Sequence, residues 1–172
     1  MMHRPLSYVA PIGSLAVLTL IAALPWGLPS DHRFFLPLLP VVAIHYWSLR
    51  HGALIPEWGV FLAGLVLDIL TLGPLGYWAL IYLAAHMIAL VSAPLASRGP
   101  ASRLVLFGLA LISVAATAWV VSSVYALELV DVGPYVIGVV YAGLVALCLV
   151  PILRAIDVQH GSIGNLRLER GG

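Results

Sequence analysis

The sequence predicts an all-α fold: a polytopic integral membrane protein whose six transmembrane helices form one membrane domain over residues 1–172. Composition is the first reason, since 62% of the 172 residues are hydrophobic and only 9% are charged, with a mean hydropathy of +1.08. A soluble domain carries roughly 25% charged residues. Because the shortage of charge extends along nearly the whole chain, we expect the lipid bilayer to be the solvent of this domain.

The second reason is a series of apolar runs bounded by polar residues, glycine or proline. They cover about residues 8–28, 34–49, 54–72, 75–97, 103–126 and 134–153, and a polar tail follows at 154–172. A helix satisfies its own backbone hydrogen bonds in lipid. These continuous runs lack the alternation that is typical of a transmembrane β-barrel, so all six are predicted to be helices.

Local signals support the individual helices in order. The first run is long and lacks a small-x-small cleavage site, so we expect a mature helix and not a signal peptide. The second run contains Pro37 and Pro40 and is short for a span of about 20 residues, which predicts a tilted, kinked or partly re-entrant segment. Glu57 follows Pro56 at the start of the third run, where the helix dipole favours an anion, and we expect it near Arg50.

The last three runs carry turn and packing signals. Pro74 stops the third helix, and Gly76 permits a tight turn into the fourth. In the sixth run, Gly138, Ala142 and Ala146 provide a small-residue surface for close helix packing.

The arginines predict the orientation. With the N-terminus inside, one arginine is external, Arg33, and seven are cytoplasmic: Arg4, Arg50, Arg98, Arg103, Arg154, Arg167 and Arg170. This is a strong positive-inside bias, so both termini are predicted to be cytoplasmic. The arginines at that interface are topology determinants that are also available to anionic lipid.

Asp68 is the outstanding candidate site, because a carboxylate in an apolar helix is costly unless it is paired, neutralised or hydrated. Steps of four, three and four place Glu57, Phe61, Gly64 and Asp68 on one face, which we expect to point into the bundle, with Gly64 leaving space for a second helix. One interpretation is a hydrogen bond that pins the helices together, with three candidate partners: Ser122, Ser123 and Tyr141. The other is an ion or proton relay.

The remaining polar and aromatic residues predict no chemistry. Trp47 and Trp58 fall close to predicted interfaces, as an aromatic belt would. His45 and His86 are isolated, so no metal site is supported. No zinc-protease, nucleophile-elbow or Walker motif is present. We therefore expect no catalytic residue, no cofactor and no nucleic-acid partner, and self-association stays open.

Four short blocks carry a family resemblance. They are Tyr46-Trp47-Ser48-Leu49-Arg50, Pro56-x-Trp58, Gly64-Leu65-x-x-Asp68-Ile69-Leu70 and Gly73-Pro74-Leu75-Gly76. Together they resemble the MreD family of rod shape-determining proteins, over about residues 40–90. In that family a Trp and a basic residue end the second helix, a Gly-Leu-x-x-Asp element lies in the third, and Pro-Leu-Gly turns into the fourth.

The resemblance implies a non-catalytic scaffold in the bacterial inner membrane. Its implied partners are MreC, the MreB filament, the glycosyltransferase RodA and the class B penicillin-binding partner of RodA, in peptidoglycan synthesis and rod cell shape. The family is also similar in fold to the substrate-binding subunits of energy-coupling-factor vitamin transporters, which implies the alternative of a small-solute binding subunit. A polar cavity near Asp68 would favour that alternative, and a dry bundle would favour the scaffold.

Overall fold

The computed structural model describes residues 8–169, without the side chains of Ser30, Asp31, Ala53 and residues 158–169. Over these residues the regular structure is helical and contains no strand, which confirms the all-α part of the predicted fold class. The helices are α1 (Val9–Ala23), α2 (Ser30–Arg33), α3 (Phe35–His51), α4 (Glu57–Thr71), α5 (Tyr77–Ala96), α6 (Pro100–Ala126) and α7 (Gly133–Glu169), with a short 3₁₀ turn, η2 (Gly52–Leu54), after α3.

Three of the described helices are long and apolar enough to cross a membrane. They are α5 with 20 residues, α6 with 27 and the Gly133–Asp157 part of α7 with 25. In contrast, α1, α3 and α4 have 15, 17 and 15 residues, below the ~20 residues of a typical span. The bundle of six spans therefore stays a prediction.

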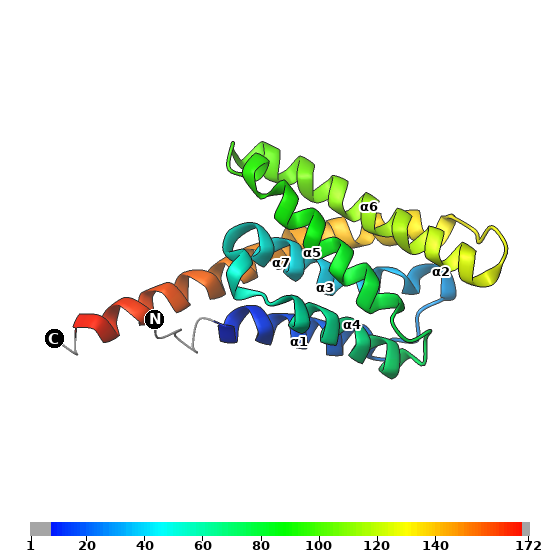
Figure 1. The fold of residues 1–172 in the computed structure, drawn as a ribbon, viewed down its shortest axis with the longest axis horizontal. Coiled ribbons are helices and arrows are strands. Elements are labelled where there is room, and N and C mark those ends of the chain that lie inside the picture. Colours follow the sequence, from blue (N-terminus) through cyan, green and yellow to red (C-terminus); the bar gives the residue numbers. More distant parts are fainter. Residues whose placement is uncertain (1–7, 170–172) are drawn as a thin grey trace.

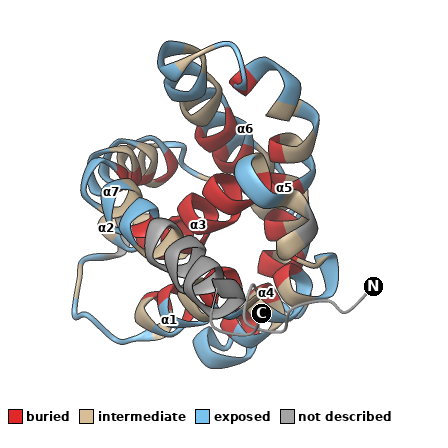
Figure 2. Cartoon of the chain, turned by 90° about the vertical axis from the view of Figure 1, so that its left-hand side faces the viewer, coloured by how far each residue is buried: buried red, intermediate tan, exposed pale blue. Residues whose placement is uncertain are grey.

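Helix α3 forms the centre of the molecule. Figure 2 shows it buried among the other long helices, and every residue from 38 to 48 is buried. The prolines do not interrupt this helix, which runs from Phe35 to His51. The Tyr82 hydroxyl of α5 donates a 2.9 Å hydrogen bond to the Pro37 carbonyl, in the turn before Pro40. Pro40 removes the intrahelical donor of the Leu36 carbonyl, four residues earlier, so the Tyr82 bond does not replace the missing one but joins α5 to α3 in the same turn.

The bundle has two distinct ends (Figure 1). At one end lie the 50–56 connection, the 97–100 connection and the C-terminal part of α7, and we call it the arginine end. At the other lie the 72–76 and 127–132 turns, and we call it the hairpin end. The helices therefore alternate in direction as the arginine pattern requires, although Arg4 and Arg170 lie outside the described residues.

Helix α7 continues beyond the apolar run. The sequence places its end near residue 153, where apolar character stops, but the helix extends to Glu169. The segment after Pro151 holds no further proline to end it. Hydropathy predicts how far the surface of the helix is apolar. It does not predict where the helix itself ends, because polar residues also maintain the backbone hydrogen bonds of a helix.

Candidate functional site: the Asp68 hairpin and the arginine cavity

Asp68 lies fully buried on α4 and binds the start of the next helix. Its Oδ2 accepts a hydrogen bond from the Gly76 backbone N–H and its Oδ1 accepts one from the Trp78 N–H, each at 2.9 Å. The first N–H groups of a helix have no partner within the helix, and its dipole favours an anion there. The carboxylate of one helix therefore caps the N-terminus of the following one.

The turn between α4 and α5 brings these groups together. At the end of α4, Leu72 is left-handed with φ +55°, and the Gly73 N–H donates to the Asp68 carbonyl at 3.0 Å. This is the pattern of a Schellman C-cap. Gly76 then takes φ +91°, a conformation that only glycine adopts readily. The chain reverses, and the α5 amides come to lie over Asp68.

Gly64 lets the two helix backbones approach each other one turn before Asp68. A Cβ added to Gly64 would overlap the backbone nitrogen and Cα of Ala79 and would lie 2.6 Å from the Trp78 carbonyl carbon. The space that the sequence assigned to a neighbouring helix is therefore filled by α5. Gly64, Asp68 and Gly76 form one structural unit, which we call the Asp68 hairpin.

The partners expected for Asp68 were wrong. Ser122 instead bonds to the Tyr77 hydroxyl at 2.8 Å, Ser123 accepts from the Val130 N–H at 3.3 Å, and Tyr141 packs on the rings of His32 and Phe35. The Trp78 amide lies only 10 residues from Asp68 along the chain. Unpaired amides at a nearby helix start satisfy the carboxylate more directly than distant hydroxyls do.

The prediction that one face of α4 points into the bundle holds for the second half of that helix only. Gly64 and Asp68 are buried, but Glu57 and Phe61 are exposed. The buried stripe also contains Val60 and Leu67, since α4 packs against both α5 and α1. Glu57 is the first residue of α4, as expected for a helix-start residue.

The two tryptophans of the resemblance have different environments. Trp47 is only 1% exposed, and its indole N–H donates a 2.9 Å hydrogen bond to Ser14 Oγ on α1. Its expected place in an interfacial belt was therefore wrong, and it belongs to the core. Trp58 is 62% exposed, which suits an interfacial ring. Periodicity alone could not separate them, because Ser14 lies 33 residues from Trp47.

Arg50 forms an ion pair that the sequence did not reveal. Its Nη1 lies 3.0 Å from Asp157 Oδ2, and the other oxygen of Asp157 lies 3.1 Å from His51 Nε2. Glu57 is not its ion-pair partner. Asp157 lies 107 residues from Arg50, on the extension of α7, so only the packing of α3 against α7 brings them together.

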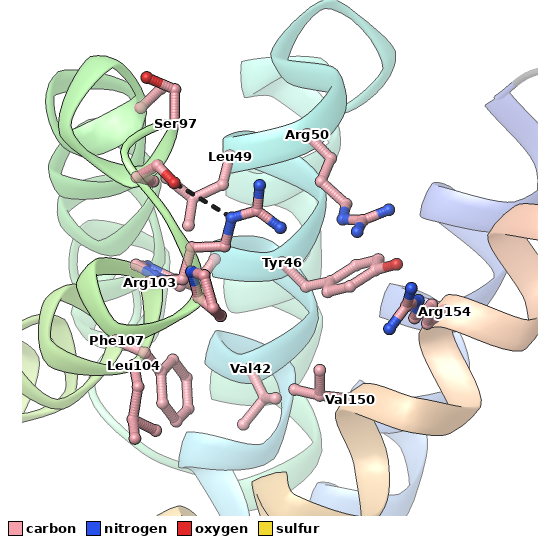
Figure 3. A pocket seen from close by; sticks show the side chains of 14 residues that line it. Val42, Tyr46, Leu49, Arg50, Ser97, Arg103, Leu104, Phe107, Val150 and Arg154 are labelled. Atoms are coloured by element: carbon pink, nitrogen blue, oxygen red, sulfur yellow. Dashed lines mark hydrogen bonds between the residues drawn. The ribbon is translucent and has the colours of Figure 1, made fainter.

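A cavity of about 540 Å³ lies at the arginine end between α3, the end of α5, the start of α6, and α7. Three arginines from three helices line it: Arg50, Arg103 and Arg154 (Figure 3). The apolar part of its wall includes Val42, Leu104, Phe107 and Val150. We call it the arginine cavity.

His45 also lines this cavity and is 3% exposed. Neither of its ring nitrogens has a hydrogen-bond partner among the described residues, and its ring packs on Phe107 at a centroid distance of 5.3 Å. His86 differs, because its Nδ1 lies 2.7 Å from Ser48 Oγ on α3. Within residues 8–169, no group of His, Cys, Asp or Glu side chains could hold a metal ion where side chains are described.

No protein-family model, curated protein or solved structure matches this chain significantly. The resemblance to the MreD family therefore depends on the four sequence blocks alone.

Proposed function

We propose that the chain is a non-catalytic scaffold of the bacterial inner membrane that binds MreC and supports the cell-elongation machinery. One observation carries this proposal. The Asp68 carboxylate, the candidate for ion or solute chemistry, is fully buried with both oxygens bound to backbone amides of α5. A carboxylate used in this way stabilises a helical hairpin and is not available to a passing ligand.

The other residues of the resemblance support the same conclusion. Gly64 serves close packing, Gly76 serves the turn, and Trp47 joins α3 to α1. Each of these residues has a packing role, as we expect in a protein whose function is to present a stable surface to partners. The outer sides of α6 and α7 carry many exposed apolar side chains, among them Leu109, Ile112, Val140 and Leu144. Such surfaces suit lipid or a transmembrane helix of a partner such as MreC.

The alternative of a vitamin-like solute subunit is less well supported, because it requires a ligand cavity near Asp68. Neither the arginine cavity nor a second cavity of about 320 Å³, lined by Leu28, His32, Phe35, Tyr141 and Val145, includes Asp68. The larger cavity lies at the end opposite the Asp68 turn. The scaffold therefore remains the better supported function.

The proposal includes six membrane spans with both termini in the cytoplasm. The short helices α1, α3 and α4 would cross with the help of their flanking residues or of a locally thinned bilayer. Reporter fusions at residues 52, 74, 98 and 130 test this topology directly. An external signal at 52 or 98 would overturn it.

The functional test is affinity purification of the tagged full chain from bacterial membranes in polymer nanodiscs, with mass spectrometry of the co-purifying proteins. We expect enrichment of MreC, and of RodA with its penicillin-binding partner, over a tagged unrelated multi-pass protein. Leu109→Arg and Ile112→Arg on α6 provide surface variants, and Glu128→Arg in the 127–132 turn is the control for charge. Enrichment of an ATPase module without envelope-synthesis proteins would replace the scaffold by the solute subunit.

A further inference from the structure

We propose that the arginine cavity binds the phosphate headgroup of an anionic phospholipid, whose acyl chains lie against its apolar wall. This inference rests on the membrane placement proposed above, but it does not depend on MreC or on any other protein partner.

The charge of the cavity favours a phosphate. Arg103 and Arg154 have no carboxylate partner among the side chains that the structure describes, and Arg50 shares Asp157 with His51. One nearby carboxylate therefore faces three guanidinium groups. Guanidinium forks bind phosphate oxygens through paired, charge-assisted hydrogen bonds, so an anion is the complementary occupant.

Two of the three arginines, Arg50 and Arg103, are held in place by contacts that leave some of their N–H donors free. Arg103 Nε donates to the Ala96 carbonyl near the end of α5 at 3.1 Å (Figure 3), which orients the guanidinium and leaves both terminal nitrogens available. Arg50 lies over the Tyr46 ring, with its Cζ 5.2 Å from the ring centroid. A preorganised set of donors loses less side-chain entropy when a ligand binds.

His45 gives an independent indication of an occupant. Buried polar atoms almost always have a hydrogen-bond partner, yet both ring nitrogens of His45 have none among the described residues, although the side chain is 3% exposed and lines the cavity. An oxygen-rich group in the cavity, such as a phosphate or glycerol ester, would supply the missing partner.

The apolar wall favours a lipid over a free phosphate ion. Leu104 lines the cavity and is 64% exposed, and the adjacent Val105 on α6 is 61% exposed. The cavity therefore opens beside the apolar outer surface of α6. Arg50 lies in the last turn of α3 and Arg103 in the first turn of α6. In the proposed membrane placement, the charged part of the cavity therefore lies at the depth of lipid headgroups and the apolar part lies where acyl chains begin.

The test is native mass spectrometry of the purified, delipidated full chain in detergent. The chain is titrated with phosphatidylglycerol, with phosphatidylcholine and with inorganic phosphate. We expect phosphatidylglycerol to bind about tenfold more tightly than phosphatidylcholine, as one added charge-assisted contact would give, and we expect phosphate not to displace it. Equal affinity for the two lipids, or displacement by phosphate, would overturn the proposal.

Variants locate the site. Arg154→Gln and Arg103→Gln should each weaken phosphatidylglycerol binding about tenfold, and Val150→Phe should weaken it by filling the cavity while keeping all three charges. The control is Arg98→Gln, which removes an exposed arginine at the same end that does not line the cavity. Thermal unfolding in the same detergent verifies that each variant is folded.

An equal loss of phosphatidylglycerol affinity in Arg98→Gln and Arg154→Gln would mean that the lipid is attracted by the basic surface in general and not by the cavity, and would overturn the proposal. Since no partner protein is present, this result is independent of whether MreC binds.

Discussion

The two ends of the bundle differ in how far their charged groups are paired within the protein. At the hairpin end, Asp68 is fully buried and both of its oxygens accept backbone hydrogen bonds. At the arginine end, three arginines line a cavity, and Asp157 is the one carboxylate paired with any of them among the side chains that the structure describes. The difference separates charge that holds the fold together from charge that is available for binding. A carboxylate in an apolar helix is the first candidate for function, yet here the side chains that remain free to bind a ligand are the arginines of the opposite end.

The largest expected effect comes from Gly64→Ala in the Asp68 hairpin. The new Cβ would overlap the Ala79 backbone. Since backbone atoms cannot rotate away as a side chain can, the overlap is relieved only if α4 moves away from α5. We expect the free energy of unfolding to fall by about 3 kcal/mol, at the upper end for overpacking. Thermal unfolding in detergent, followed by circular dichroism, measures it.

The matched control is Gly108→Ala on α6, where nothing lies within 4 Å of an added Cβ. This variant should unfold at or slightly above the temperature of the unaltered chain, since alanine favours helix. Equal stability of the Gly64 and Gly108 variants would show that the hairpin is not closely packed.

Asp68→Ala is expected to have the next largest effect. It leaves the Gly76 and Trp78 amides without their acceptor, at a cost of about 2–3 kcal/mol. The stability of Asp68→Asn should lie between those of Asp68→Ala and the unaltered chain, because the side-chain amide oxygen can still accept one of the two hydrogen bonds. Detergent unfolding with both variants measures the series.

Asp131→Ala is the control for Asp68, since Asp131 accepts an exposed hydrogen bond from the Gly133 N–H in the other turn. We expect a change within about 0.5 kcal/mol there. If Asp68→Ala were equally harmless but abolished transport of a solute, the structural role assigned to Asp68 would be wrong.

Trp47→Phe sharpens the comparison within the core. It keeps an aromatic side chain but removes the hydrogen bond to Ser14 Oγ and part of the volume of a fully buried indole, so we expect the free energy of unfolding to fall by about 2 kcal/mol. Ser14→Ala removes only the hydrogen bond and should cost about 1 kcal/mol, and the double variant should cost less than the sum. Trp58→Phe, at a 62% exposed position, should leave stability unchanged.

The smallest effect on stability is expected at the arginine end. The Arg50–Asp157 pair is partly exposed, with side-chain exposures of 34% and 17%, so Asp157→Asn should cost at most about 1 kcal/mol. It should also strengthen phosphatidylglycerol binding, because Arg50 no longer faces a carboxylate. Native mass spectrometry with the same lipid measures this change. Weaker lipid binding in Asp157→Asn would contradict the charge argument for the cavity.

Sequence reasoning succeeded where a single residue type dictates local geometry. Gly64 and Gly76 act as their lack of a side chain predicts, and six long helices occur close to the six apolar runs. It failed where a partner is distant along the chain. Trp47 pairs with Ser14 across 33 residues and Arg50 with Asp157 across 107.

By itself, then, the sequence determined the helical class and the turn residues, because hydropathy and backbone preference act over one to five residues. The tertiary structure alone decided which face of α4 is buried, that α3 becomes the centre despite Pro40, and that three arginines from α3, α6 and α7 share one cavity. The physical reason is that burial and charge pairing depend on which helices meet. Because this chain is so apolar, almost every face of each helix could be buried. Which faces are buried is therefore decided by how well the helices fit against each other.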